Sequence, residues 1–490
     1  MSIKAIIVSA LGALPLVGGC AAGQDYSDAQ LYSGFTLVDP VAQTQTENAW
    51  LVVRDGLIAE TGSGAAPDGA FASVHDVSGL YGMPGLIDAH AHITIGPFET
   101  GVENGAPFIG FEAGGEYSRF NAAVALAFGV TTVRNPAGVT DANQEYDLMI
   151  ASGEWAGPEA LHAGAVIQPP PLGGESFAYP TTPEEWDAEA ARQTATGMTY
   201  FKLYHDLTEA ELAEGVRAAN AHGLIPIAHL NGVSWTRAAE LGVRQIEHAL
   251  PTSADLLEPD VRAGFNSADP TAAYMYRWFE LADFDGPLIT QMIDTLVERE
   301  VAVDLTMIVN DVTYHANDLE RVFPLSERIY YHPVSFASAK GNYDAIAGVW
   351  TAHDFARADA AFARVLEFAR RIYEAGVPLM IGTDGTGGAP IYARELSHHV
   401  AAGIPAWDVL RIATAENARL MGLGDLTGRI APGMEADLVF LRADPVADVQ
   451  NVREVELVVT NGRARRPEDL LNIARDIATA ARAQQPAAAD

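Results

Sequence analysis

The chain has 490 residues, of which 49% are hydrophobic, and a formal net charge of −34 at pH 7. This charge argues against nucleic acid or anionic lipid as a partner, since both would be repelled. The length exceeds one ordinary domain, although barrels of about 250 residues are common as single units. With one cysteine, Cys20, no disulfide within the chain holds the fold.

The N-terminus predicts an export signal. Lys4 supplies a positive charge, and residues 5–16 form an apolar stretch that is too short to span a bilayer as a mature helix. Val17-Gly-Gly-Cys20 resembles a bacterial lipoprotein box, in which the cysteine becomes the acylated first residue. We expect a signal peptide at 1–19, a tether at 20–33 and a lipid anchor at Cys20 facing the periplasm. An ordinary cleaved signal and a buried free thiol are the alternatives.

Strand-like segments near both ends of the chain predict a small β-sandwich. Residues 34–39 and 49–58 are such segments, and Asp55-Gly56 is a hairpin signal. Residues 437–441 and 455–462 have the same character. We expect a sandwich of residues 34–83 and 421–466, a barrel of residues 84–420, and a terminal helix and tail at 467–490.

Short apolar segments rich in β-forming residues alternate with helical patterns in the middle of the chain. The segments are 129–134, 161–166, 199–204, 224–229, 244–248, 301–306 and 377–384, and helical patterns include 209–221, 234–241 and 355–375. Such alternation predicts a parallel sheet. With the apolar run before His90 there are eight units, which predicts an α/β fold with a closed (β/α)8 barrel and catalytic residues at the carboxyl ends of its strands.

Polar residues at the ends of these segments are candidate metal ligands. His90 and His92 are one residue apart, so in an extended strand both point to one face and can approach one cation. Neutral imidazole is a common zinc ligand. Four more candidates lie at or near the end of a later segment: Lys202, His229, His248 and Asp384.

The motifs that carry these residues resemble the amidohydrolase superfamily, in particular its imidazolonepropionase- and prolidase-like branch of metal-dependent hydrolases. They are Gly-Met-Pro-Gly-Leu-Ile-Asp-Ala-His-Ala-His at 82–92, Gly-Val-Thr-Thr-Val-Arg at 129–134, Phe-Lys-Leu-Tyr at 201–204, Ile-Glu-His at 246–248 and Gly-Thr-Asp at 382–384. Segments 413–422 and 428–440 are also typical of this group. The resemblance spans residues 31–466 and implies a barrel flanked by a small β-sandwich.

The resemblance also implies a metal centre. It predicts two divalent ions, zinc being favoured because imidazole and carboxylate suit it. The first ion would be bound by His90, His92 and Asp384, and the second by His229 and His248. Lys202 would bridge the ions as a carbamate, formed when burial lowers the pKa of its amine and the free amine takes up carbon dioxide. A lysine that extends its ammonium from the strand end is the alternative.

The expected reaction is hydrolysis of a carbon–nitrogen bond. Two ions that share a water lower the pKa of that water toward neutrality. Asp384 would take up its proton and pass it to the leaving nitrogen, as general base and then general acid. Tyr204, two residues after Lys202, could donate a hydrogen bond to the substrate carbonyl, or simply pack beneath a loop. We expect a dipeptide or an N-acyl amino acid as substrate.

Other functions remain open at this stage. A mononuclear cyclic-amide hydrolase would not need the Lys202 bridge, and a lactonase, esterase or phosphotriesterase would use the same ions. A noncatalytic binding lipoprotein would be expected to lack some of the six residues. A homo-oligomer is possible. Long connections at 168–177, 314–324 and 330–336 are expected to be loops that form the walls of the substrate pocket.

Overall fold

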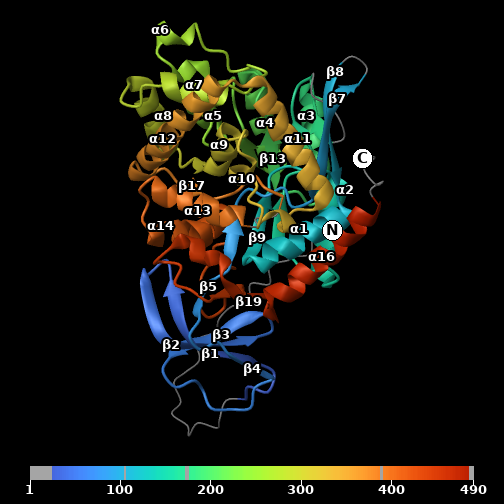
Figure 1. Ribbon diagram of the computed structural model, residues 1–490, viewed down its shortest axis with the longest axis vertical. Helices are drawn as coiled ribbons and strands as arrows, with labels where there is room; N and C mark the ends of the chain where they lie inside the picture. Colours follow the sequence, from blue (N-terminus) through green and yellow to red (C-terminus); the bar gives the residue numbers. More distant parts are fainter. Residues whose placement is uncertain (1–24, 104–105, 171–175, 387–389, 485–490) are drawn as a thin grey trace.

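The computed structural model describes residues 25–103, 106–170, 176–386 and 390–484. The chain has an α/β fold with mixed sheets, in which a β-sheet lies at one end and a larger body of strands and helices at the other (Figure 1). In the ranges just given, no helix combines the length and the apolarity that crossing a membrane requires.

Both ends of the chain contribute to one eight-stranded sheet, with the order β20-β19-β18-β5-β1-β2-β3 and β4 paired to β1. The strands are β1 (Gln30–Asp39), β2 (Thr44–Arg54), β3 (Leu57–Ser63), β4 (Ser73–Asp76), β5 (Tyr81–Pro84), β18 (Leu438–Leu441), β19 (Val455–Thr460) and β20 (Arg463–Arg465). Asp55 and Gly56 join β2 to β3 with φ of 53° and 81°, as a two-residue type I′ hairpin requires.

The predicted tether is shorter than expected. β1 begins at Gln30, and the preceding Tyr26 and Ala29 are already buried. The Tyr26 ring stacks on Phe71 at 4.7 Å between centroids, so the chain joins the fold before residue 33. The predicted signal peptide and Cys20 lie outside the described residues.

The body contains two sheets of parallel strands, with the orders β10-β9-β6 and β12-β11-β13-β14-β15-β16-β17. The strands are β6 (Leu86–Asp88), β9 (Val130–Asn135), β10 (Glu159–His162), β11 (Val166–Ile167), β12 (Phe177–Ala178), β13 (Tyr200–Leu203), β14 (Ile225–Ala228), β15 (Gln245–Glu247), β16 (Ala302–Asp304) and β17 (Leu379–Met380). Parallel bridges join the two sheets at Ala163–Tyr200 and at Ala91–Gly385. The strand before His90 therefore lies beside the end of β17.

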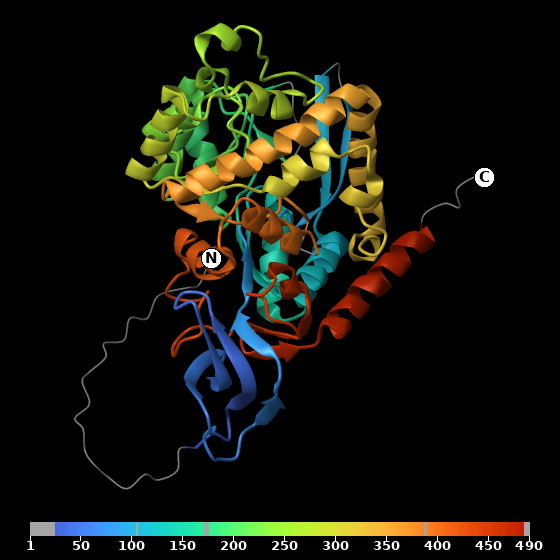
Figure 2. The same ribbon diagram turned by 60° about the vertical axis from the view of Figure 1, so that its left-hand side comes forward.

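Helices connect these strands and cover the outside of the body (Figure 2). They are α1 (Gly115–Ala127), α2 (Thr140–Ser152), α3 (Pro183–Ala195), α4 (Glu209–Ala221), α5 (Trp235–Leu241), α6 (Pro259–Arg262), α7 (Tyr274–Leu281), α8 (Pro287–Glu298), α9 (Met307–Tyr314), α10 (Leu319–Val322), α11 (Pro333–Val349), α12 (Ala352–Glu374), α13 (Ile391–Ala401), α14 (Ala406–Arg411), α15 (Asn417–Leu420) and α16 (Pro467–Gln484). Capping boxes at Thr182, Thr208 and Thr351 fix the starts of α3, α4 and α12. The last helix, α16, matches the predicted terminal helix.

The long connection before Asp384 differs from the expectation. Segments 314–324 and 330–336, predicted as loops, overlap α9, α10 and α11. An antiparallel hairpin, β7 (Ile95–Glu103) with β8 (Ala106–Ala113), was not predicted and stands beside α11 (Figure 1). The backbone N–H of Phe98 donates to Ser338 Oγ at 3.1 Å, and that hydroxyl donates to the Phe98 carbonyl at 2.8 Å. This reciprocal pair fixes the hairpin to the helix.

Candidate metal centre and active site

The six predicted ligands lie at or just beyond the carboxyl ends of parallel strands and line one cavity of about 340 Å³. His90 and His92 follow β6, Lys202 lies in β13, His229 follows β14, His248 follows β15 and Asp384 follows β17. Tyr204 lines the same cavity. The structure thus brings together every candidate that the sequence indicated.

Both paired histidines contact the carboxylate of Asp384. Its Oδ1 lies 3.0 Å from His90 Nε2 and 2.9 Å from His92 Nε2. One ligand atom from each of the three residues lies within 4.8 Å of the others, which is close enough to surround one cation. Asp88 orders this end of β6, because its carboxylate accepts from the backbone N–H groups of His90 and Thr383, each at 3.1 Å.

His229 and His248 form a second group next to the first. Their ring centroids are 4.5 Å apart, and the His248 ring lies 4.8 Å from that of His90. His248 Nδ1 is 2.7 Å from Thr306 Oγ1, which leaves its Nε2 as the nitrogen available to a ligand. Neither ring nitrogen of His229 has a hydrogen-bond partner among the described residues.

The backbone is strained at three of these strand ends. Asp384, His248 and Thr306 have φ of 56°, 68° and 37°, in the left-handed region that side chains other than glycine rarely adopt. Such strain persists only where surrounding contacts enforce it, and it clusters at functional sites. Here the positive φ turns the backbone sharply after each strand, so that the side chains of Asp384 and His248 reach the cavity.

Lys202 is a buried amine, only 2% exposed. No hydrogen bond or ion pair joins it to another described residue. Burial lowers the pKa of its ammonium, with Arg134 contributing in the same direction against the carboxylates of Glu247 and Asp384. A lowered pKa is the condition for a neutral amine that can react with carbon dioxide.

A buried ionic cluster beneath the site was missed by the sequence analysis. Arg134 Nη1 and Nη2 lie 2.6 and 2.9 Å from the two oxygens of Glu247, and Nη2 lies 3.2 Å from Asp304 Oδ2. Glu247 Oε2 lies 2.7 Å from His90 Nδ1. All four side chains are at most 1% exposed. The signal in the sequence was the presence of charged residues inside otherwise apolar strand segments.

The charges around His90 favour a cation. Burial alone lowers the pKa of His90, but the carboxylates of Asp384 and Glu247 outweigh it and raise that pKa to about 10. Burial raises the pKa of Asp384, yet His90 and His248 hold it well below the usual range. Arg134 does the same for the pKa of Glu247. Two carboxylates therefore stay ionised next to the paired histidines.

Tyr204 lies beside the second histidine group. Its ring centroid is 5.0 Å from that of His229 and 4.4 Å from that of His205. Burial raises the pKa of the Tyr204 phenol, so the hydroxyl remains a hydrogen-bond donor at neutral pH. His205 pairs with Asp206 through Nδ1 at 2.7 Å and does not line the cavity.

An aromatic wall covers one side of the cavity. It consists of Phe98 and Phe111 from the β7–β8 hairpin and Phe177 from β12. The centroids are 6.0 Å apart for Phe98–Phe111 and 6.4 Å for Phe111–Phe177. Only Phe177 belongs to a segment predicted to form a wall; residues 171–175 of that segment lie outside the described residues.

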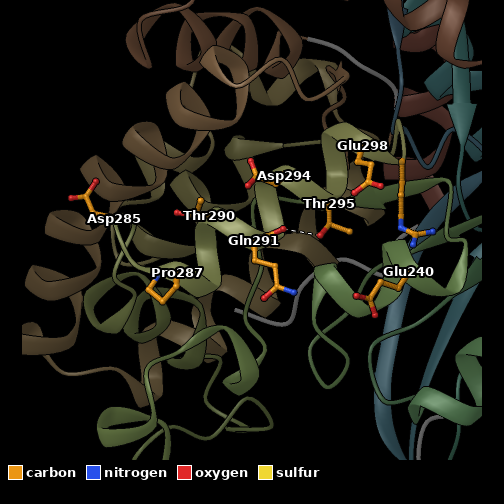
Figure 3. Close-up of a pocket in the computed structure, with 9 residues that line it drawn as sticks. Glu240, Asp285, Pro287, Thr290, Gln291, Asp294, Thr295 and Glu298 are labelled. Carbon is orange, nitrogen blue, oxygen red and sulfur yellow. Dashed lines mark hydrogen bonds between the residues drawn. The ribbon is translucent and has the colours of Figure 1, made fainter.

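A larger cavity of about 680 Å³ lies on the outside of the body, between α5 and α8 (Figure 3). Its lining side chains are mostly polar and exposed, four of the nine are acidic, and they include none of the six predicted ligands. The Thr295 hydroxyl donates to the Gln291 carbonyl at 2.7 Å, a bond within α8 (Figure 3). The surface there offers no group arranged for chemistry.

The model of the amidohydrolase family matches residues 81–465. The chain therefore belongs to the amidohydrolase family and is a metal-dependent hydrolase that acts on carbon–nitrogen bonds. No curated protein matches the chain.

Solved structures share its fold at low sequence identity. A Xaa-Pro dipeptidase with bound methionine in the active site is 20% identical with a TM-score of 0.65, covering 89% of this chain and all of the other. A putative prolidase from Bifidobacterium longum is 22% identical with a TM-score of 0.62, covering 92% of this chain and 99% of the other. Bottromycin amidohydrolase is 21% identical with a TM-score of 0.65, covering 93% and 91%.

The residues present fit the metal that the family requires. His90 and His92 direct their Nε2 atoms at one carboxylate oxygen, as ligands of a shared cation do. The two ring nitrogens of His229 have no hydrogen-bond partner among the described residues and are available as donor atoms. Imidazole and carboxylate donors together suit zinc and similar divalent ions.

Proposed function

We propose that this protein binds two divalent ions, preferably zinc, and hydrolyses an amide bond in a small substrate such as a dipeptide or an N-acyl amino acid. The observation that carries the proposal is the convergence of six side chains on one cavity: His90, His92, Lys202, His229, His248 and Asp384. In this proposal eight of the ten parallel strands form a closed (β/α)8 barrel: β6, β9, β10, β13, β14, β15, β16 and β17. The bridges at Ala163–Tyr200 and Ala91–Gly385 support closure. The sheet from both chain ends folds as a small β-sandwich beside it.

The six side chains would form two groups of metal ligands and a bridge. His90, His92 and Asp384 would hold one ion, and His229 and His248 would hold the other. Lys202 lines the same cavity and has a lowered pKa, and as a carbamate it would bridge the ions. Its terminal carboxylate would replace the positive charge of an ammonium, which would repel both ions.

In the proposed amide hydrolysis, Asp384 transfers a proton and Tyr204 donates a hydrogen bond. When bound, the ions supply an activated water and polarise the carbonyl group. Asp384 is ionised at neutral pH because its pKa is well below the usual range, so its carboxylate can accept a proton from the attacking water. It returns that proton to the leaving nitrogen. Tyr204 keeps its proton and donates a hydrogen bond to the carbonyl oxygen.

Two observations favour peptide-like amides over the alternatives. The motif Phe-Lys-Leu-Tyr at 201–204 supplies the bridging lysine that a mononuclear cyclic-amide hydrolase does not need. Two proteins of similar fold are named as a Xaa-Pro dipeptidase and a putative prolidase. A cavity of about 340 Å³ is of a size suited to a small molecule.

A substrate panel tests the proposal. Zinc-reconstituted protein is assayed with dipeptides, N-acyl amino acids, lactones and esters, and amides are expected to turn over best. Asp384→Asn is expected to lower kcat by about 10²–10⁴-fold with little change in KM. Asp294→Asn, on the exposed surface of α8, is the matched control. Rapid turnover of lactones or esters with every amide inert would contradict amide hydrolysis.

We also propose that the protein is a lipoprotein anchored through Cys20 and facing the periplasm. The support is the segment Val17-Gly-Gly-Cys20 after an apolar stretch. Labelled palmitate is expected to enter the wild type and not Cys20→Ser, because acylation requires the thiol. Equal membrane retention of both proteins, without label in either, would refute this location.

A further inference from the structure

In the described part of the chain, the cavity wall has no cationic side chain beyond those of the proposed metal centre. In the part of the chain that the structure describes, its ionisable lining residues are the six proposed ligands and Tyr204. No arginine is among the lining residues. The segments 104–105, 171–175 and 387–389, which interrupt the described ranges, contain no lysine, arginine or histidine in their sequence. Lys202 is the only lysine among the described residues that line the cavity, and the proposed function assigns it to the metals.

The side of the cavity formed by the hairpin is aromatic and rigidly held. Phe98 is fixed through its backbone to Ser338 of α11 by the two hydrogen bonds at 3.1 and 2.8 Å. Phe111 lies between Phe98 and Phe177, so three rings form a continuous surface. Rings held in this way bind flat apolar groups at a low cost in conformational entropy.

Aliphatic side chains from later connections complete the lining. Leu250, just after β15, is 2% exposed, and Val309 on α9 is half-buried. Val166 of β11 is buried and pairs with Phe177 of β12, on the aromatic side of the cavity. The connections after several different strands thus all present apolar groups to the substrate.

We propose that the preferred substrate is an amide with uncharged, apolar groups on both sides of the scissile bond, one of them aromatic. This inference rests on the proposed amide hydrolysis and narrows its substrate class: N-acyl amines and peptides with a blocked carboxyl end are preferred over free N-acyl amino acids. The physical reason is desolvation. A carboxylate that leaves water for this cavity finds no guanidinium or ammonium to pair with, whereas a phenyl ring finds three.

A matched pair of substrates tests the inference. N-acetyl-2-phenylethylamine and N-acetyl-L-phenylalanine share the same skeleton and differ by one carboxylate. With zinc-loaded wild-type protein, kcat/KM is expected to be higher for the uncharged compound by about tenfold or more. A higher kcat/KM for the carboxylate compound would overturn the inference while leaving amide hydrolysis intact.

Calorimetry separates the inference from the proposed function. If neither compound is hydrolysed, amide hydrolysis fails for this pair, and the binding of the two compounds to zinc-loaded protein still decides the charge preference. Tighter binding of N-acetyl-2-phenylethylamine supports an apolar site. Tighter binding of N-acetyl-L-phenylalanine, at any turnover, overturns it.

A gain-of-function variant gives a second test. Val309→Arg places a cation on the wall, and Val309→Met is the control of similar reach without charge. The ratio of kcat/KM for the carboxylate compound to that for the uncharged compound is expected to rise about tenfold in Val309→Arg relative to Val309→Met. Metal content and thermal unfolding are measured for both variants. An unchanged ratio in a folded, metal-loaded Val309→Arg protein would contradict the inference. It would show that the lack of a cation on the wall does not limit binding of the carboxylate compound.

Discussion

Glu247 Oε2 lies 2.7 Å from Nδ1 of His90, at the opposite end of the imidazole from Asp384. A hydrogen on Nδ1 is thereby held by Glu247, so Nε2 is the nitrogen left to bind a metal. Arg134 pairs with both oxygens of Glu247 and keeps its carboxylate ionised. A guanidinium, a carboxylate and an imidazole thus form a chain that ends at the proposed ion.

Glu247→Gln is expected to weaken metal binding by about 10–100-fold, because a neutral amide orients and polarises the His90 ring less well than a carboxylate. Competition with a chromophoric chelator measures the affinity. Glu240→Gln, on the exposed surface of α5, should keep the affinity of the wild type. Equal affinities in the two variants would mean that Glu247 serves only the packing of the cluster.

His229→Ala is expected to reduce the metal content from about two ions per chain to about one, since His229 belongs to one of the two proposed ligand groups. Elemental analysis by mass spectrometry gives the stoichiometry. His222→Ala, at the carboxyl end of α4, should retain about two ions. A wild type that is fully active with a single ion would rule out the binuclear centre.

Lys202→Ala is expected to lose metal and activity, with partial rescue by short carboxylic acids that take the place of the carbamate. Lys340→Ala is the control, because Lys340 is half-buried on α11, does not line the cavity and pairs with Asp344 at 2.5 Å. Carbon-13 NMR after exchange with labelled bicarbonate should detect a carbamate in wild type and in Lys340→Ala only. An unmodified Lys202 ammonium in a metal-loaded crystal would rule out the bridging role.

Asp437 is expected to make the stability depend on pH. Burial raises the pKa of this carboxyl from 3.8 to about 6 in the folded protein. As the pH rises from about 4 to 6, the unfolded chain releases the proton before the folded protein does, so the free energy of unfolding falls. Asp437→Asn should flatten this part of the profile, measured by denaturant unfolding at each pH. Exposed Asp425→Asn should leave the slope as it is; a slope equally steep in Asp437→Asn would contradict the assignment.

The convergence of the six proposed ligands on one cavity could be predicted because it follows from the period of a strand and from chain position. His90 and His92 share a face at a spacing of two, and the remaining ligands each end an apolar run. The carboxyl ends of parallel strands meet at one edge, so their side chains converge without further information. The same spacing of two predicted that Tyr204 shares a face with Lys202, and both side chains line the cavity.

The supporting cluster and the wall could not be predicted in the same way. Glu247 and Asp304 stand out as charged residues in apolar strand segments, but the sequence does not show which residue pairs with them. Arg134 reaches them only through the three-dimensional register of β9, β15 and β16. The β7–β8 hairpin was missed because glycine and proline interrupt its alternation. Asn104-Gly105 between the two strands is a hairpin signal that could have indicated it.

The pairing of β5 with β18 joins two segments that leave the ribosome at very different times. Pro84 pairs with Leu438 and Tyr81 with Leu441, and the Gly85 N–H donates to the Asp437 carbonyl at 2.9 Å, immediately before the strand that leads to His90. During translation β5 leaves the ribosome long before this partner exists. The histidines therefore gain their final support only after residue 441 has emerged, and a protein that ends before Leu438 would keep every proposed ligand while losing the strand that holds the first two in place.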